Sequence, residues 1–288
     1  MKWFFRILII VIAMAGIGLM GYPLYNNYLY EKGQKELAAY YDQLAAEITP
    51  EERDKRWDEC EEYNRELLAG NVSLSDPFGE GGEVSGDSRY YSLLSLDEDG
   101  AMGSFVVPGL IGPLVIYHGT EEKILQKGVG HTKTSSLPVG GKGTHAILSA
   151  HTGLTNKKLF TNLDQLEMGD VFFLKILGEK LAYQVDKIKV VLPTEARDDL
   201  LIDPEQDYVT LVTCTPYGIN SHRLLVRGTR ITYEEAEQIA NNTPKKGSTW
   251  LSKYLKSLIM GVGIAVGLWI LMRLPRRIIK SMKKRKEE

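Results

Sequence analysis

Cysteine is almost absent from this sequence of 288 residues, which contains only Cys60 and Cys214. Two cysteines are too few for a framework of disulfides, and they form no C-x-x-C pair. The five histidines form no H-x-x-x-H pair, so a zinc site is not expected. We therefore predict that the protein needs no metal and no cofactor.

Other common signals are also missing. The sequence has no G-x-S-x-G motif. The glycine-rich run Val139–Gly143 precedes a predicted strand rather than a helix, so it does not suggest a phosphate-binding loop. The net charge is only −2, and the middle of the chain carries the acidic excess. An acidic middle region is a poor nucleic-acid binder, so we expect no nucleic-acid partner.

Two long apolar stretches flank the middle of the chain. Ile7–Tyr25 carries no charge and is long enough to span a bilayer, and a second stretch runs over Trp250–Met272. Eight basic residues follow from Arg273 onward, and two more lie near the N-terminus. Because cytoplasmic flanks carry an excess of Lys and Arg, we expect two membrane spans with both termini cytoplasmic. Residues 26–249 would then lie outside the cell.

The segment Tyr28–Gly70 is predicted to form two helices. Thr49, Pro50 and Glu52 have the pattern of an N-cap, a first helical residue and a capping-box acid. Cys60 lies in the second helix, on an apolar stripe typical of packing, and we expect it to be structural. The stretch that follows, residues 71–100, is rich in glycine and is predicted to be mostly loop.

The region from residue 101 to 232 is predicted to be mainly β. Short apolar segments separated by turn residues indicate about eight strands, and this number suggests a closed barrel. Short helical turns are expected near Leu159–Gln165 and Thr194–Leu200, and a short helix over Glu234–Thr243. The predicted strands are Ser104–Val107, Leu114–Tyr117, Ile124–Val129, Thr144–Ala150, Val171–Ile176, Leu181–Leu192, Tyr208–Thr213 and Leu224–Ile231.

The segment Tyr208–Arg230 reads as two strands joined by a turn. Cys214 lies at the end of the first strand, and Arg223 opens the second strand nine positions later. If the two strands pair, the thiol and the guanidinium can reach one site. A nearby cation favours the thiolate, which is the nucleophilic form of cysteine.

A catalytic imidazole is expected to complete such a site. His151, in the segment ILSAHTGL, ends a predicted strand and is our first choice. The other histidines, at positions 118, 131, 145 and 222, are alternatives for which structural roles are expected. Arg227 and Arg230 are alternatives to Arg223, but they lie further along the strand.

These motifs together resemble a known family. TLVTC with Arg223 after it and HTG before it is similar to the signature of sortases, the cysteine transpeptidases of Gram-positive surfaces. The similarity covers roughly Gly103–Ile231, and strings such as KLFTNLDQLEMGD look like the pilus-assembling subgroup, class C. The resemblance implies a closed barrel in which Cys214 is the nucleophile, His151 the general acid and base, and Arg223 the electrostatic stabiliser.

The resemblance also gives a meaning to Asp76-Pro77-Phe78 in the glycine-rich stretch. Class C sortases are known for a lid with an Asp-Pro-aromatic motif. By this resemblance, Asp76 would pair with Arg223 and Phe78 would cover Cys214. Without the resemblance, the tripeptide would be read as an ordinary turn.

The implied function is cleavage of a sorting motif similar to Leu-Pro-X-Thr-Gly, followed by transfer to a lysine of a pilin subunit. The implied partners are pilin subunits, the membrane and a cell-wall precursor. A housekeeping sortase that anchors proteins to peptidoglycan is the alternative. A membrane-tethered barrel that only binds, with a structural Cys214, is a third reading.

These expectations divide the chain into seven parts. They are an N-terminal anchor (1–25), N-terminal helices (26–70), a lid-bearing region (71–100), a catalytic barrel (101–232), a linker (233–249), a C-terminal transmembrane helix (250–274) and a basic tail (275–288).

Overall fold

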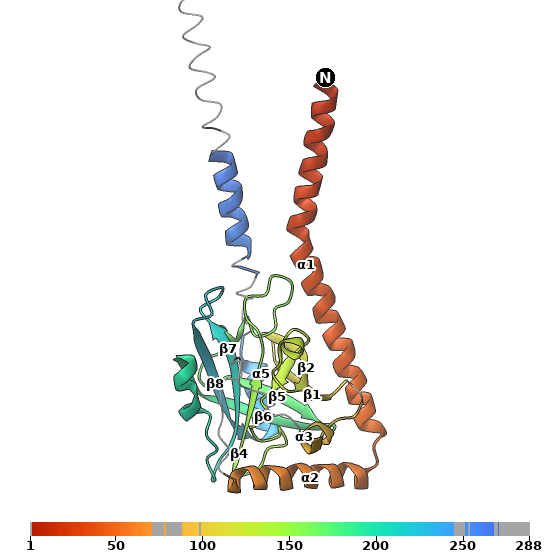
Figure 1. The fold of residues 1–288 in the computed structure, drawn as a ribbon, viewed down its shortest axis with the longest axis vertical. Helices are drawn as coiled ribbons and strands as arrows, with labels where there is room; N and C mark the ends of the chain where they lie inside the picture. The colour runs from red at the N-terminus through yellow and green to blue at the C-terminus, as the bar shows by residue number, and fades with distance from the viewer. Residues whose placement is uncertain are drawn as a thin grey trace, which may run out of the picture. The chain divides into compact units, whose positions relative to one another are not determined.

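The computed structural model describes residues 2–70, 78, 88–97, 99–244, 251–252, 254–267 and 270. The chain divides into two units, residues 1–247 and residues 248–288. The described residues of the second unit are helical. The first unit is a barrel of strands with helices packed around it (Figure 1).

The barrel is closed and has eight strands, as predicted, in the order β1-β2-β3-β4-β7-β8-β6-β5. Two neighbouring pairs, β2 with β3 and β4 with β7, are parallel, and the other pairs are antiparallel. The strands are β1 (Ala101–Val107), β2 (Ile111–His118), β3 (Val129–His131), β4 (Thr144–Ser149), β5 (Val171–Ile176), β6 (Glu179–Val191), β7 (Asp207–Thr215) and β8 (His222–Ile231).

One predicted strand is wrong. Within Ile124–Val129, the chain first completes the short helix α4 (Glu122–Leu125), and β3 begins only at Val129. Backbone bonds from Gln126 to Glu122 and from Gly128 to Ile124 close these helical turns. An apolar run this short has no periodicity that separates a strand from a helix.

Alternation along the strands gives the barrel two apolar layers. Ala146 and Leu148 of β4 belong to the central core, whereas Ile147 belongs to a second cluster on the outer face. Successive side chains of a strand point to opposite faces, so this division follows from the sequence of β4. The outer cluster consists of Ile147, Val191, Ala196, Leu200, Val212 and Leu225.

Helices cover other parts of the barrel. The long helix α1 (Lys2–Glu47) packs Ala38 and Tyr41 against β1 and β2. The next helix, α2 (Pro50–Ala69), has Thr49 as its N-cap, as predicted, and contributes Cys60 and Tyr63 to the central core. A short helix that was not predicted, α3 (Ser88–Ser92), also packs on this core.

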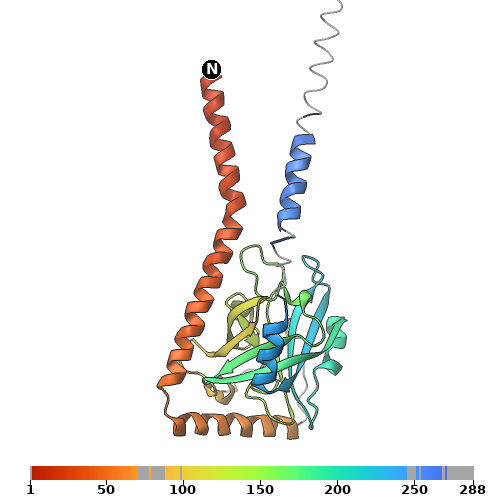
Figure 2. The same cartoon turned by 180° about the vertical axis from the view of Figure 1, so that it is seen from behind.

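The remaining helical segments agree with the sequence analysis. The 3-10 helices η1 (Leu163–Gln165) and η2 (Pro193–Asp199) occur where turns were expected. The helix α5 (Tyr233–Asn242) lies on the outside of the barrel (Figure 2) and buries Ala236 against β5 and β6. It has a complete capping box made by Thr232 and Glu235.

The two predicted membrane spans, residues 1–25 and 250–274, are not supported. Within the described part of the chain, no helix combines the length and the apolar character that crossing a bilayer requires.

Candidate active site

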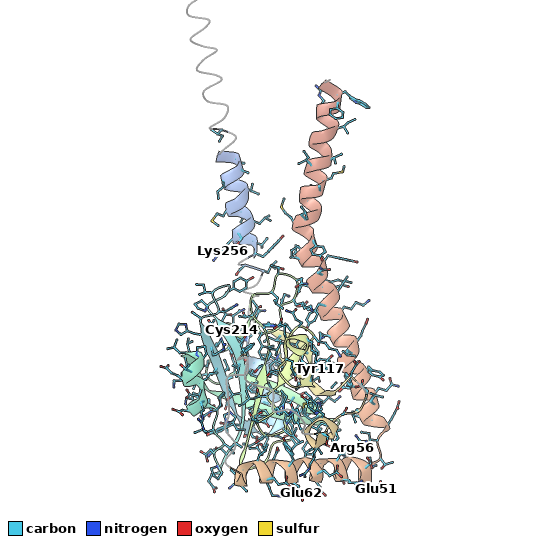
Figure 3. All side chains as sticks on the ribbon, viewed as in Figure 1. Glu51, Arg56, Glu62, Tyr117, Cys214 and Lys256 are labelled. Carbon is cyan, nitrogen blue, oxygen red and sulfur yellow. The ribbon has the colours of Figure 1, made fainter. Side chains whose placement is uncertain are left out.

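Cys214 and Arg223 face each other across the β7–β8 hairpin. The two residues are register partners, and Arg223 Nη1 lies 3.4 Å from Cys214 Sγ. Figure 3 labels Cys214 near the end of the barrel opposite to α2, where Glu51 and Glu62 lie. Cys214 lies two residues after Val212 on β7, and Arg223 lies two residues before Leu225 on β8. Their side chains therefore point to the outer face of the barrel, as those of Val212 and Leu225 do. The hairpin therefore places a guanidinium directly beside the thiol.

The surroundings of Arg223 hold its side chain in place. Arg223 is only 8% exposed, whereas Cys214 is half-buried. Nη1 also lies 3.5 Å from the carbonyl oxygen of Asn220 and 3.4 Å from that of His222. A buried cation needs such acceptors, and one placed beside a sulfur atom favours its thiolate form.

His151 follows β4, the strand that pairs with β7, two residues after the end of β4. In the parallel pair, Ser149 of β4 is opposite Val212 of β7, and Ala150 N–H donates to the Val212 carbonyl over 3.2 Å. One residue further on, Thr213 Oγ1 donates to the Ala150 carbonyl over 2.7 Å. The register therefore brings His151, just beyond β4, level with Cys214 near the end of β7.

The His151 side chain is 20% exposed and has a partner that the sequence analysis missed. Its Nε2 lies 3.1 Å from Oε2 of Glu122, at the start of α4. Nothing in the local sequence indicates a role for Glu122, because it precedes the strand predicted over Ile124–Val129. The backbone of the loop is also fixed, since Phe160 N–H donates to the His151 carbonyl over 3.1 Å.

Phe78 of the predicted lid lies over the same site. Its ring centroid is 6.1 Å from that of His151, and the Arg223 guanidinium carbon is 5.0 Å from the ring centroid. The ring also packs against the outer apolar cluster. Phe78 therefore lies against both His151 and Arg223, whereas Asp76, the other predicted lid residue, lies outside the described residues.

The alternative residues from the sequence lie in other surroundings. His145 bonds Thr210 and the Leu201 carbonyl, and burial lowers its pKa to about 4. Burial lowers the pKa of His131 to about 3 and also lowers that of His118. Arg227 makes two hydrogen bonds to Asp186, of 3.0 and 2.8 Å, away from the thiol.

No cluster of three or more His, Cys, Asp or Glu side chains suited to a metal occurs in the part of the chain that the structure describes. The chemistry available at this site is that of a thiol, an imidazole and a guanidinium. Such a set is suited to acyl transfer through a thioester.

Comparison with known proteins identifies the family. The model of the Sortase domain family matches residues 106–231. A solved sortase C of Streptococcus pneumoniae is 41% identical, with a TM-score of 0.64, and the match covers 69% of this chain and 97% of that one. The chain belongs to the sortase family. The prediction of a class C sortase from the motifs is thereby confirmed.

Other relatives agree with this assignment. The pilus-related sortase C of Group B Streptococcus is 39% identical, with a TM-score of 0.61, over 67% of this chain and 96% of that one. Sortase A of Bacillus anthracis is 25% identical over 224 residues, which is 78% of this chain and 93% of that protein. Because sortases are cysteine transpeptidases, this sortase is an enzyme rather than a barrel that only binds.

Proposed function

We propose that this sortase assembles pili, with Cys214 as the nucleophile, His151 as the general acid and base, and Arg223 as the stabiliser of negative charge. The observation that carries the proposal is the 3.4 Å contact between Arg223 and the Cys214 sulfur, level with His151 at the ends of parallel strands. The solved relatives named as pilus sortases support the choice of substrate.

The first half-reaction forms the acyl-enzyme. The Cys214 thiolate attacks the threonine carbonyl of a motif similar to Leu-Pro-X-Thr-Gly, and the carbonyl oxygen gains negative charge near the Arg223 guanidinium. The C–N bond to glycine then breaks, and His151 gives a proton to the departing amine. The product is a thioester between Cys214 and the threonine.

The second half-reaction joins two subunits. A lysine amine of a neighbouring pilin attacks the thioester carbonyl, and His151 accepts a proton from this amine. The carbon–sulfur bond breaks, and the Cys214 thiolate is regenerated next to Arg223. The result is an isopeptide bond, and the enzyme returns to its starting state.

The outer apolar cluster is proposed to receive the apolar residues of the sorting motif. The cluster lies on the barrel face that also carries Cys214 and Arg223, and Phe78 packs against it. We propose that Phe78 belongs to a lid and occupies the place of a substrate side chain. Asp76 is proposed to be the lid's partner for Arg223, as the resemblance to class C sortases implies.

The place of the reaction is part of the same proposal. We propose that the barrel lies outside the cell, since sortases are generally membrane-associated extracellular enzymes. The measurement is labelling of Cys214 in intact cells by a charged thiol reagent that does not cross membranes. Labelling only after lysis would contradict this location.

The choice of acceptor separates pilus assembly from anchoring to peptidoglycan. The purified full-length chain is incubated with a sorting peptide and either a pilin-derived lysine peptide or a cell-wall peptide amine. We expect an isopeptide product with the pilin lysine, identified by mass. Transfer only to the cell-wall amine would instead establish the housekeeping function.

A further inference from the structure

Glu122 is the partner of His151, and no role has so far been given to it. Its Oε2 lies 3.1 Å from His151 Nε2, and its Oε1 accepts a 2.7 Å hydrogen bond from Gln126. The carboxylate is thus held from two sides, although its side chain is 69% exposed. Its neighbour Glu121 instead accepts a hydrogen bond from the Tyr91 hydroxyl.

The order of the strands places Glu122 at one end of a row. Along the barrel rim, the row runs from Glu122 between β2 and β3, to His151 after β4, to Cys214 on β7 and to Arg223 on β8. The strand order therefore puts the Glu122 carboxylate on the β3 side of His151 and the Cys214 thiol on its β7 side. The outer apolar cluster belongs to β4, β6, β7, β8 and η2, away from the carboxylate.

The two segments that carry this pair are tied to each other. Lys157, in the loop after His151, donates to the Gln126 carbonyl at the end of α4 over 2.5 Å. Helix α1 holds both segments: the buried Asn27 accepts from Lys158 N–H over 2.9 Å, and Gln34 donates to the Lys127 carbonyl over 3.1 Å. The backbone segments that carry Glu122 and His151 are therefore held in place by these hydrogen bonds.

A carboxylate accepts hydrogen bonds only, so the imidazole nitrogen beside it carries the proton. In the neutral ring, a proton on Nε2 leaves Nδ1 as the basic nitrogen, and the hydrogen bond at one nitrogen sets the tautomer. We infer that Glu122 is a positioning residue that keeps His151 in the tautomer with Nδ1 free to take the proton of the Cys214 thiol. This inference rests on the proposed function, because it assigns Glu122 a part in the same reaction.

In the first half-reaction, His151 carries the thiol proton to the leaving amine. The thiol proton moves to Nδ1 of His151, the ring then carries protons on both nitrogens, and Glu122 stays ionised. The proton on Nδ1 next passes to the departing glycine amine as the C–N bond breaks. The proton on Nε2 remains with the hydrogen bond to Glu122 throughout.

The kinetic test compares three variants of the full-length chain with the wild type. Glu122→Ala is expected to lower kcat for thioester formation by about tenfold with little change in KM, because a wrong tautomer lowers turnover and this exposed partner restrains the ring only partly. Glu122→Gln keeps an acceptor oxygen and is expected to stay within about threefold of the wild type. Glu121→Ala removes the neighbouring carboxylate and serves as the matched control, expected to match the wild type.

The tautomer itself is read by NMR of the chain with ¹⁵N-labelled histidine, through the coupling between each ring nitrogen and the ring protons. We expect the His151 proton on Nε2 in the wild type and in Glu122→Gln, and a mixture of tautomers in Glu122→Ala. An unchanged tautomer in Glu122→Ala would overturn the inference, whether or not the rate falls. Glu122→Gln as slow as Glu122→Ala would also overturn it, because charge and not the hydrogen bond would then matter.

The two proposals fail in different ways. A wild-type chain that forms no thioester with any sorting peptide contradicts the proposed function, and the NMR measurement then still decides the role of Glu122. A wild-type chain that forms the thioester, with Glu122→Ala equal to it in rate and tautomer, contradicts only the role of Glu122.

Discussion

The two cysteines of this chain lie in opposite surroundings. Cys60 is fully buried in the central core, and this burial, aided by the negative charge of Glu59, raises the pKa of its thiol to about 12. Cys214 is half-buried at the end of β7 and lies 3.4 Å from a guanidinium nitrogen. The same side chain is thus a small packing residue in one place and a proposed nucleophile in the other. The difference shows that the position on the fold decides the chemistry of the thiol.

The histidines repeat this contrast. His118 and His131 bond the buried Tyr90 or nearby carbonyls in the interior, where burial lowers their pKa. His151 lies at the rim, with a carboxylate on one nitrogen and Phe78 against its ring. The interior therefore keeps neutral imidazoles as structural groups, and the rim provides one that is accessible to substrate.

The largest effect is expected from removing the rim thiol. Cys214→Ala should abolish cleavage of a sorting peptide and leave the fold intact, since the nucleophile is lost and the residue lies in no part of the core. The matched control is Cys60→Ala, which should keep full activity and lose about 1 kcal/mol of stability through a small cavity. Peptide cleavage and thermal unfolding measure both effects. A Cys214→Ala chain that still joins subunits would contradict the assignment of Cys214 as the nucleophile.

The guanidinium beside the thiol is the next element to remove. Arg223→Ala is expected to lower kcat/KM by about 10²- to 10³-fold, the loss that follows removal of one preorganised donor to a developing oxyanion. Arg223→Lys keeps the charge but not the planar fork, so only part of the activity should return.

Arg227→Lys is the control for Arg223 because it changes the same kind of side chain on the same strand. Arg227 pairs with Asp186 and not with the sulfur. We expect its turnover to stay close to that of the wild type. Equal losses for Arg223 and Arg227 variants would mean that Arg223 acts through the stability of β8 alone.

Much of this arrangement could be predicted from the sequence. The alternation in TLVTC and RLLVRG, with a turn between, gave the β7–β8 hairpin and therefore the pairing of Cys214 with Arg223. The four residues Thr49-Pro50-Glu51-Glu52 carry the N-cap signal, and they correctly predict the start of α2. Both signals depend only on neighbouring residues, so they can be recognised without knowledge of the rest of the fold.

Features that depend on contacts between distant segments could not be predicted. Glu122 meets His151 only because α4 packs against β3, the neighbour of β4 in the barrel, whereas the sequence predicts a strand over Ile124–Val129. The second apolar layer outside the barrel was also missed, because alternation shows two faces but does not show that both are covered.

The buried histidines predict a loss of stability in acid. The folded-state pKa of His131, about 3, lies below the unfolded value, so the unfolded chain binds more protons at low pH. The contribution of this residue is full above about pH 6.5 and falls by about 1.4 kcal/mol per pH unit below it.

Denaturant unfolding at about pH 7 and about pH 5 measures this slope. A His131→Gln variant should show a weaker dependence on pH than the wild type. Equal slopes for the wild type and His131→Gln would contradict the account of the interior histidines.

A smaller effect is expected from uncovering the thiol. Phe78→Ala removes the ring that lies between His151 and Arg223, and we expect alkylation of Cys214 by a small reagent to become about 3- to 10-fold faster. Asp76→Ala should act in the same direction if this residue also holds the lid. Cys60 in the same molecule is the control and should stay unlabelled. An unchanged rate at Cys214 would argue against a covering lid.

The most direct test of the account uses both cysteines of one molecule. The full-length chain is mixed with a sorting peptide, quenched in acid and digested, and the position of the acyl group is mapped by mass. The account predicts a thioester to the threonine of the peptide on Cys214 and none on Cys60. No acyl group on Cys214, or an equal amount on Cys60, would contradict it.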